Sequence, residues 1–244
     1  MTKLPNRIMT NPLPSLRSSL RSHADVATRT TFQRFFKEEV KFYGVRSGTV
    51  AKIAKDYFAA IKDSGKKRIF GLCEELFKSG ISEESWIAAN WAYWIRKQFT
   101  SDDYKIFERW VNKYVHNWAA CDTLCNHAVG ALVEMYPQCI TGLKKWAKSK
   151  NRWLKRAAAV TLIIPAKEGK FLQDIFTIAH ILLLDPDDMV QKGYGWMLKE
   201  AGRNHQKEVF GYVMKNRAVM PRTALRYAIE KMSPDLRKRA MAKG

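Results

Sequence analysis

Apolar residues recur three and four positions apart along most of the chain after residue 29, as they do in an amphipathic helix. Alternating stretches bounded by hairpin turns are nearly absent. The pattern predicts helices over 31–43, 47–61, 67–79, 83–97, 103–115, 119–135, 138–148, 152–164, 169–184, 187–201, 205–217, 221–232 and 234–242. Proline or glycine separates most of these segments, so we expect short helices with short links. Ser82, Ser101 and Asp187 are predicted N-caps.

A basic residue followed by small or apolar residues recurs in the C-terminal half. The three copies are Arg156-Ala-Ala-Ala-Val160, Lys192-Gly-Tyr-Gly-Trp196 and Arg222-Thr-Ala-Leu-Arg226, at intervals of 36 and 30 residues. Small residues let helices pack closely, and helix pairs at such intervals are typical of HEAT-like repeats. The sequence therefore predicts an all-α, HEAT-like helical repeat solenoid, an α-α superhelix with a concave basic face. An irregular helical bundle with coincidental spacing is the alternative.

The N-terminal stretch differs in composition from the rest of the chain. It is rich in arginine and serine and has no acidic residue before Asp25. We predict a basic N-terminal arm over residues 1–28 and a single HEAT-like repeat domain over 29–244. A transit peptide has a similar composition, and so does a basic arm that contacts DNA. The favoured interpretation is a flexible or lightly helical arm on a cytoplasmic protein. The apolar run 175–184 is too short to cross a membrane.

The charge balance points to a polyanionic partner. The 244 residues include 43 lysines and arginines against 23 aspartates and glutamates, a net charge of +20. Residues 141–244 hold 22 of the basic residues and 9 of the acidic ones, so this half is the better candidate for the anion-binding surface. Neutralising phosphates releases condensed counterions, which favours nucleic acid. A basic protein without such a partner, or one that touches anionic membranes, is the alternative.

The cysteines offer little evidence for a metal site. Cys121 and Cys125 lie four residues apart near His127, but no second cysteine pair completes a set of four ligands. We expect Cys73, Cys121, Cys125 and Cys139 to be reduced, buried thiols, and we expect no metal or redox cofactor. Phosphate-binding glycine loops and hydrolase nucleophile motifs are also missing from the sequence.

Three short segments bring aromatic residues together with polar or charged ones. Trp118 and Asp122 are four residues apart, so both lie on one face of a helix, with Asp122 beside the apolar stripe. The alternative for this pair is a solvated or capping aspartate next to a core tryptophan. In the second segment, Arg152, Lys155 and Arg156 surround Trp153 near a helix start and can hold phosphates, or they form an ordinary solvated face.

The third segment, Val190-Gln-Lys-Gly-Tyr-Gly-Trp196, places aromatic rings among glycines in a predicted helix. Glycine weakens a helix, so two of them indicate a close approach by another group. Core packing of Trp196 is the alternative interpretation.

These segments resemble the AlkD-like DNA alkylation repair family, which consists of DNA glycosylases built from HEAT-like repeats. The resemblance covers about residues 30–232 and keeps the family's order of motifs. The motifs are Phe42-Tyr-Gly-Val-Arg46, Trp118-x-x-x-Asp122, Asn151-x-Trp-Leu-x-Arg-Ala-Ala158 and Gln191-Lys-x-x-Gly-Trp196-x-Leu-x-Glu200. One departure is Ala119, where the family often has aspartate.

The resemblance implies excision of N3- or N7-alkylated purines from duplex DNA. Asp122 matches the catalytic carboxylate, Trp118 and Trp196 match aromatic residues lining the lesion site, and Arg156 matches an arginine beside the lesion. An alkylated purine is already cationic and a good leaving group, so a single carboxylate that stabilises the oxocarbenium-like sugar suffices. The basic neighbours Arg152, Lys155 and Lys192 are expected to contact DNA.

Two other functions remain compatible with this sequence. Some relatives with degraded sites bind unusual DNA without excising bases, so a non-catalytic binder of branched or distorted DNA is the first alternative. A protein–protein scaffold is the second, because helical repeat arrays offer extended binding surfaces. The basic bias and the ordered motifs favour DNA, and we expect a monomer.

Overall fold

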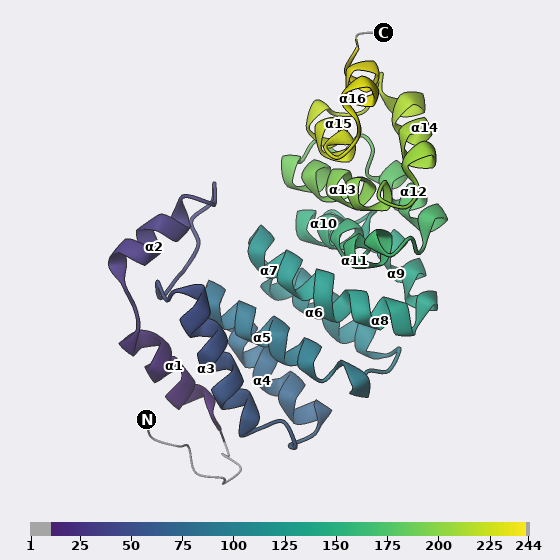
Figure 1. Cartoon of the computed structure of the whole chain (residues 1–244). Helices are drawn as coiled ribbons and strands as arrows, with labels where there is room; N and C mark the ends of the chain where they lie inside the picture. Colours follow the sequence, from purple (N-terminus) through teal and green to yellow (C-terminus); the bar gives the residue numbers. More distant parts are fainter. Residues whose placement is uncertain (1–10, 243–244) are drawn as a thin grey trace. The chain divides into compact units, whose positions relative to one another are not determined.

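The computed structural model describes residues 11–242, which are helical except for connecting loops and one isolated bridge between Lys41 and Ile81 (Figure 1). The predicted all-α repeat architecture is confirmed. The described residues form two compact units. Among the described residues, the first comprises 11–99 and 113–124, and the second comprises 100–112 and 125–242.

The first unit is built around α5, in which Ala88, Ala89 and Ala92 are buried together with Ile87 and Trp91. Helices α3, α4 and α7 pack against α5, and the indole of Trp91 donates a hydrogen bond to the Ala54 carbonyl at 3.0 Å. The helices of this unit are α1 (Leu13–Ser22), α2 (Val26–Gln33), α3 (Ser47–Ala59), α4 (Lys66–Lys78), α5 (Ser82–Trp94), the 3-10 helix Arg96–Gln98 and α7 (Trp118–Thr123). Most of the predicted segments in this range are confirmed within one to three residues.

Part of the stretch predicted as an arm is docked on the first unit. Residues 13–22 form α1, which packs on α3 and buries Leu13, Leu16 and Leu20. Arg17 of α1 forms an ion pair with the buried Glu84 at 2.8 Å. Spacing of the leucines by three and four positions is the helical signal in this segment. Residues 1–10 of the predicted arm lie outside the described range.

The predicted helix over residues 31–43 is wrong beyond Gln33, where α2 ends and a loop leads to α3. A buried carboxylate organises this loop. Glu83, which is 5% exposed, accepts hydrogen bonds from the backbone amides of Tyr43, Gly44 and Val45 at 3.2, 2.8 and 3.1 Å. These bonds replace those that a continued helix would have made, so tertiary structure overrides the local periodicity.

Gly44 is required at its position in this loop. Its φ angle is +88°, and a Cβ atom there would lie 2.3 Å from the carbonyl oxygen of Asp25. The neighbouring Tyr43 donates its hydroxyl proton to Glu84 at 2.7 Å. Burial, with that hydrogen bond, raises the pKa of Tyr43 to about 12. The loop is therefore held to the first turn of α5 through both of its glutamates.

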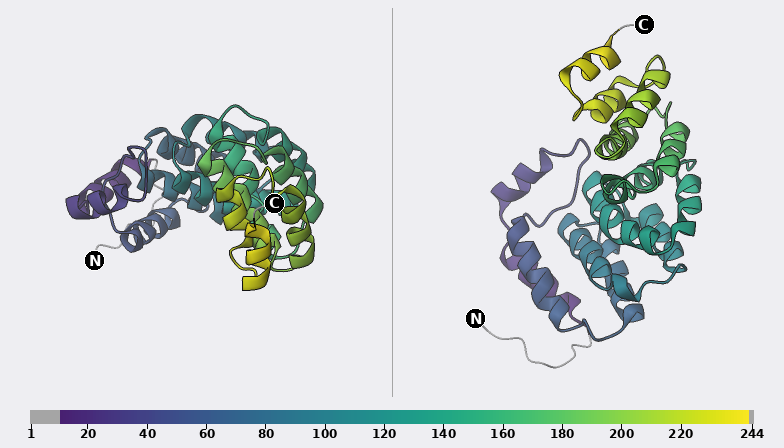
Figure 2. Two further views of the ribbon diagram at one scale, coloured as in Figure 1. Left: turned by 90° about the horizontal axis from the view of Figure 1, so that it is seen from above. Right: turned by 45° about the vertical axis from the view of Figure 1, so that its right-hand side comes forward.

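The second unit is organised around α13, which packs against α10, α11, α12 and α15. In Figure 1, α13 lies between α10 and α15 and packs against both. The turned view in Figure 2 shows the same order, from teal at α10 to yellow at α15. The helices of this unit are α6 (Asp103–Tyr114, up to residue 112), the π-helix Leu124–Val129 (from residue 125), α8 (Gly130–Met135), the 3-10 helix Pro137–Cys139, α9 (Ile140–Trp146), α10 (Arg152–Val160), α11 (Ile163–Lys167), α12 (Leu172–Ile181), α13 (Asp188–Ala201), α14 (Gln206–Asn216), α15 (Arg222–Ile229) and α16 (Pro234–Met241).

Glu200 ties the end of α13 to the segment that follows α15. Its buried carboxylate pairs with Lys231 at 3.0 Å and with Arg203. Burial opposes ionisation, but the hydrogen bonds from these two cations outweigh it, and the pKa of Glu200 lies below its ordinary value of 4.5. The stability that this group contributes is therefore present above pH 4.5 and is lost as the pH falls through the lowered pKa.

We expect Glu200→Gln to lower the free energy of unfolding at neutral pH by about 1–2 kcal/mol, because two partly buried cations lose their counter-ion. The difference in the free energy of unfolding between this variant and the wild type should shrink as the pH falls below the ordinary glutamate pKa of 4.5. Urea unfolding across this pH range measures it. The control is Glu230→Gln, which removes an exposed carboxylate paired with Lys199 and should change stability by less than about 1 kcal/mol. Equal losses in both variants would contradict the assignment.

Candidate nucleic-acid site

The predicted pair Trp118 and Asp122 lies on α7 with both side chains partly exposed. Asn117 is the N-cap of this helix and accepts a hydrogen bond from the Ala120 amide at 2.9 Å. Asp122 is therefore not a capping residue. Cys121, the next residue inward, is buried. The prediction that Asp122 lies beside the apolar stripe is confirmed, and its side chain is only partly buried.

The indole of Trp118 is held by two contacts from the chain that follows α2. Its ring stacks on Phe36 with 5.1 Å between the centroids and 19° between the planes. Its Nε1 donates a hydrogen bond to the Phe35 carbonyl at 3.3 Å. The sequence segments containing Trp118 and Phe36 are more than eighty residues apart, so their spacing could not reveal this contact.

A π-helix over Leu124–Val129 begins directly after α7. Such wider turns are rare and occur frequently at functional sites, because they change the direction of side chains along a helix. The sequence predicted one regular helix over 119–135 and did not reveal this irregularity. It starts two residues after Asp122, which itself lies in the α-helical segment α7.

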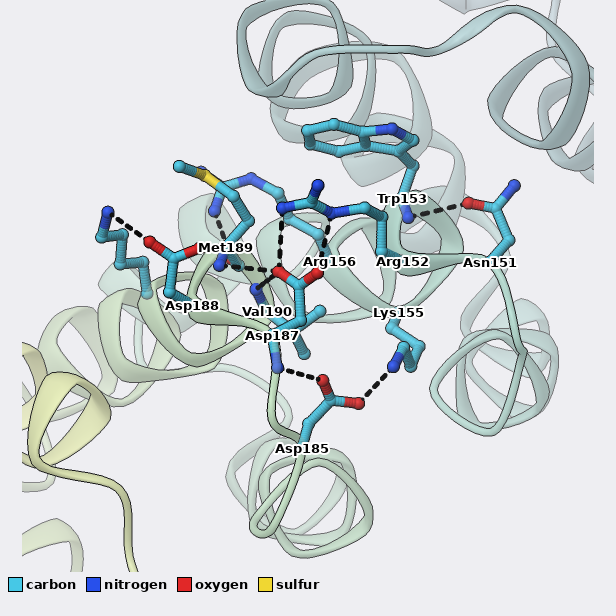
Figure 3. A network of polar contacts seen from close by, with 11 residues as sticks. Asn151, Arg152, Trp153, Lys155, Arg156, Asp185, Asp187, Asp188, Met189 and Val190 are labelled. Carbon is cyan, nitrogen blue, oxygen red and sulfur yellow. Dashed lines mark hydrogen bonds and ion pairs between the residues drawn. The ribbon is translucent and has the colours of Figure 1, made fainter. Parts of the chain in front are cut away.

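The predicted basic residues of the second unit gather at the N-terminus of α13 (Figure 3). Arg156 is 5% exposed, and its guanidinium donates a hydrogen bond to the Met189 carbonyl at 2.5 Å. A Cβ atom on Gly193 would lie 3.3 Å from the Cγ of Arg156. Gly193 therefore makes room for the arginine stem, which is one of the close approaches that the glycine pattern predicted.

Each of the other three basic residues is paired with an acidic residue near the start of α13 (Figure 3). These pairs are Arg152 with Asp187 at 2.8 Å, Lys192 with Asp188 at 3.2 Å, and Lys155 with Asp185. Asp187 is also the N-cap of α13, as predicted, and accepts hydrogen bonds from the Met189 and Val190 amides. The prediction of Ser82 as an N-cap is wrong, because α5 begins at Ser82 and Ile81 precedes it. The guanidinium of Arg152 lies 5.0 Å from the Trp153 ring centroid.

This arrangement decides how the basic cluster can act. In Arg152 and Lys192 about a third of the side chain remains exposed, whereas Lys155 is more enclosed. Partly exposed ion pairs contribute little to stability, so phosphate oxygens can exchange with the carboxylates at low energetic cost. Arg156 differs in that its guanidinium donates a hydrogen bond to a backbone carbonyl, that of Met189.

The two aromatic residues of the third segment have different environments. Tyr194 is fully buried and donates its hydroxyl proton to the Leu183 carbonyl at 3.1 Å. Trp196 is only partly buried. Core packing therefore describes Tyr194, while the indole of Trp196 keeps surface available to a ligand.

Gly195 allows α15 to approach α13. A Cβ atom at this position would lie 2.7 Å from the Cβ of Tyr227 and 2.8 Å from the Ala224 carbonyl oxygen. Gly211 is the contrasting case, since its Cβ would meet nothing within 4 Å on α14. The close approach that the glycine pattern predicted is thus made by another helix of the same chain.

We expect Gly195→Ala to destabilise the protein by about 1–3 kcal/mol, because the added methyl group overlaps backbone atoms of α15. Gly211→Ala should have the opposite sign and stabilise the protein by about 0.5–1 kcal/mol, because alanine is the better helix former. Chemical unfolding of both variants measures the two effects. A stabilising Gly195→Ala would mean that the two helices are not closely packed.

The four cysteines are buried and free of disulfides, as predicted. Between residues 11 and 242, no three metal-ligating side chains come together. No helix within that range is long and apolar enough to cross a membrane. The structure thus brings Trp118 close to the chain after α2, places Asp122 one turn further along α7, and groups Arg152, Lys155, Arg156 and Lys192. Trp118 and Asp122 belong to the first unit, and the four basic residues belong to the second.

Comparison with known proteins gave two related findings. A family model described as "DNA alkylation repair enzyme" matches residues 16–232. A solved structure described as a "Predicted DNA alkylation repair enzyme from Enterococcus faecalis" is similar, with a TM-score of 0.78 and 15% sequence identity. The similarity covers 87% of this chain and 98% of that chain, and at this identity it concerns the fold. A comparison with curated protein sequences found no match.

Proposed function

Because this chain belongs to the DNA alkylation repair enzyme family, we propose that it is a DNA glycosylase acting on cationic N3- and N7-alkylated purines in duplex DNA. Family membership supports a role in DNA repair and DNA as the substrate. The specific reaction would be removal of bases such as 3-methyladenine and 7-methylguanine, as the first step of base excision repair.

The observation that carries this proposal is the placement of Asp122 one helical turn after a tryptophan whose ring is held in place. Trp118 is fixed by its stack on Phe36 and by its bond to the Phe35 carbonyl. Asp122 keeps part of its side chain exposed on α7. A carboxylate near the sugar would stabilise positive charge that develops at C1′, and a rigid indole face would contact the cationic nucleotide.

The reaction needs no acid to activate the leaving group. The bond between C1′ and the purine nitrogen breaks, and its electron pair neutralises the cationic base. A water oxygen then bonds to C1′ and its proton passes to the Asp122 carboxylate or to solvent. The products are the free alkylated base and an abasic site. The role of Asp122 is to stabilise the oxocarbenium-like sugar and to orient the water.

The basic cluster of the second unit would bind the DNA backbone. Arg156 would contact a phosphate beside the lesion, and Arg152, Lys155 and Lys192 would exchange their aspartate partners for phosphate oxygens. Trp196 would add a second aromatic contact. Binding of this kind weakens as salt is raised, since each phosphate contact releases counterions.

A comparison between a cationic and a neutral lesion base tests this mechanism. We expect purified protein to release 7-methylguanine from a duplex and to leave uracil in the same sequence context essentially untouched. Uracil is neutral and needs protonation to leave, whereas the alkylated purine does not. Chromatography of the released bases from both duplexes measures this. Efficient uracil release would contradict a mechanism that relies on the positive charge of the lesion.

A further inference from the structure

The third copy of the basic repeat, Arg222-Thr-Ala-Leu-Arg226, has no part in the proposed reaction. The first two copies supply Arg156 and Lys192 to the basic cluster at the start of α13. The third lies on α15, which packs against α13 but carries no residue of that cluster. Its two arginines are exposed, and because they are four residues apart they lie on one face of the helix.

The last helix, α16, adds three further exposed cations, Arg237, Lys238 and Arg239. It packs against α14 and α15 with Ala240 buried, and Figure 1 shows it beside α15. The family match ends at residue 232, so α16 lies outside the part of the chain that the family model covers. Membership of the family therefore does not account for the basic residues of this helix.

These five side chains form the C-terminal basic surface, which comprises Arg222, Arg226, Arg237, Lys238 and Arg239. None of them forms an ion pair with a carboxylate between residues 11 and 242. In the cluster at the start of α13, by contrast, three of the four basic residues are paired with aspartates. An anion that binds the C-terminal basic surface does not have to displace a carboxylate, so this surface attracts polyanions more strongly.

Contacts with backbone carbonyls and a ring hold this surface in place. The guanidinium of Arg222 donates a hydrogen bond to the Met241 carbonyl at 3.4 Å, and that of Arg217 donates one to the Arg239 carbonyl at 3.1 Å. The guanidinium of Arg239 lies 5.1 Å from the ring centroid of Phe210. Such contacts fix α16 against its neighbours without neutralising the cations, and a pre-organised cation loses less conformational entropy on binding an anion.

The sign of the charge in this region is more uniform than solubility requires. The last helix of a repeat array needs a polar outer face, but a mixture of charges would serve that purpose. Residues 210–242 contain eight lysines and arginines against two aspartates and glutamates. One of these two acids, Glu230, is paired with Lys199 outside the segment. The excess of positive charge therefore indicates a polyanionic partner.

The residue types favour a phosphate backbone over a membrane surface. Four of the five members are arginines, whose planar guanidinium can bind phosphate oxygens through two hydrogen bonds. A helix that lies on a membrane needs a free apolar face as well as cations. In α16, Ala240 is buried and Leu236 and Met241 are partly buried, so the apolar side of this helix is already used for packing.

We propose that α15 and α16 carry a second DNA-binding surface, which contacts the phosphate backbone of intact duplex and does not recognise damage. Binding there is independent of base sequence and keeps the protein on DNA between lesions. The choice of DNA as the partner rests on membership of a DNA repair family and not on the glycosylase reaction. A protein that excises no base would bind duplex at this surface in the same way.

The test measures binding of an undamaged duplex by fluorescence anisotropy over a range of salt concentrations. In the double variant Arg237→Gln with Lys238→Gln, affinity at low salt should fall about five- to tenfold. The slope of the logarithm of the binding constant against the logarithm of salt concentration should decrease in magnitude by about 1–2, since each phosphate contact contributes about 0.9. The matched control is Lys105→Gln with Lys145→Gln, which removes two exposed lysines from α6 and α9 and should lower affinity less than about twofold.

Unchanged DNA affinity in the α16 variant would overturn the proposal, and loss of its binding to anionic lipid vesicles would then assign the surface to a membrane. An equal loss of affinity in the control would also overturn it, because net charge rather than this surface would then govern binding. The exchange Arg237→Lys with Lys238→Arg keeps both charges and should bind within about twofold of the wild type. Thermal melting checks that each variant is folded.

Single-turnover base release separates this inference from the proposed function. At saturating protein, the α16 variant should release 7-methylguanine at the wild-type rate, because the surface holds DNA and does not act on the lesion. Slow release at saturation would place α16 in the reaction and overturn the proposal. If the wild type releases no base but the α16 variant still loses duplex affinity, the glycosylase activity is removed and the second surface stands.

Discussion

Replacing Asp122 with asparagine is expected to lower the rate of 7-methylguanine release about a hundred- to a thousandfold while DNA affinity stays nearly unchanged. Asparagine keeps the size of the side chain and removes the charge that stabilises the sugar cation. Losses of this size are typical when one electrostatic contact to the transition state is removed. Because Asp122 is partly exposed on α7, the substitution should not disturb the core of the first unit.

Single-turnover release of the base from a methylated duplex measures this effect, with DNA binding followed on the same preparation. The matched control is Asp102→Asn, which removes one negative charge from an exposed side chain, 84% accessible and paired with Lys105. That variant should release base at the wild-type rate. Full activity in Asp122→Asn would exclude Asp122 from the reaction. Slow release in both variants would indicate a general effect of charge.

Replacing Glu83 with alanine should have the largest effect on stability, a loss of about 3–5 kcal/mol. The substitution leaves the amides of Tyr43, Gly44 and Val45 without their acceptor, and unpaired buried amides cost about 1–3 kcal/mol each. The loop between α2 and α3 would then detach from α5, and the stack of Phe36 on Trp118 would be lost.

Chemical unfolding measures the loss, and limited proteolysis locates it. We expect new cleavage between residues 34 and 46 in Glu83→Ala. Glu83→Gln is the graded control, since its amide oxygen can still accept some of these hydrogen bonds. This variant should lose about half as much free energy of unfolding as Glu83→Ala. A loss below about 1 kcal/mol in Glu83→Ala would mean that water satisfies the loop amides and that the carboxylate does not organise the loop.

Hydrophobic periodicity was sufficient to predict most of the helices, because each buries one apolar stripe in its own unit. It failed at residues 34–43, where the phenylalanines have helical spacing but line a cavity instead. The signal that opposes a helix there is Gly44, whose positive φ is compatible with a turn and not with a helix. Its partner Glu83 is distant in sequence, so the pairing was invisible without the structure.

In the candidate site, too, the arrangement of residues within one helix could be predicted, whereas their contacts with residues distant in sequence could not. The shared helix face of Trp118 and Asp122 follows from their spacing alone. The clustering of Arg152, Lys155 and Arg156 was also predictable, because all three lie within one short helix. The acidic partners of Arg152 and Lys155 come from the segment that begins with Asp185, about thirty residues later. The cations could therefore be found from the sequence, whereas the carboxylates paired with Arg152 and Lys155 could not.

The most direct test of the central claim is chromatographic detection of free 3-methyladenine or 7-methylguanine after incubation of the purified wild-type protein with methylated duplex DNA. DNA binding is measured in parallel at two salt concentrations. We expect release of the free base and an abasic site in the duplex, together with binding that weakens at higher salt. Salt-sensitive binding without any base release would contradict it. That result would make the protein a binder of distorted DNA and direct attention to Ala119, beside Trp118.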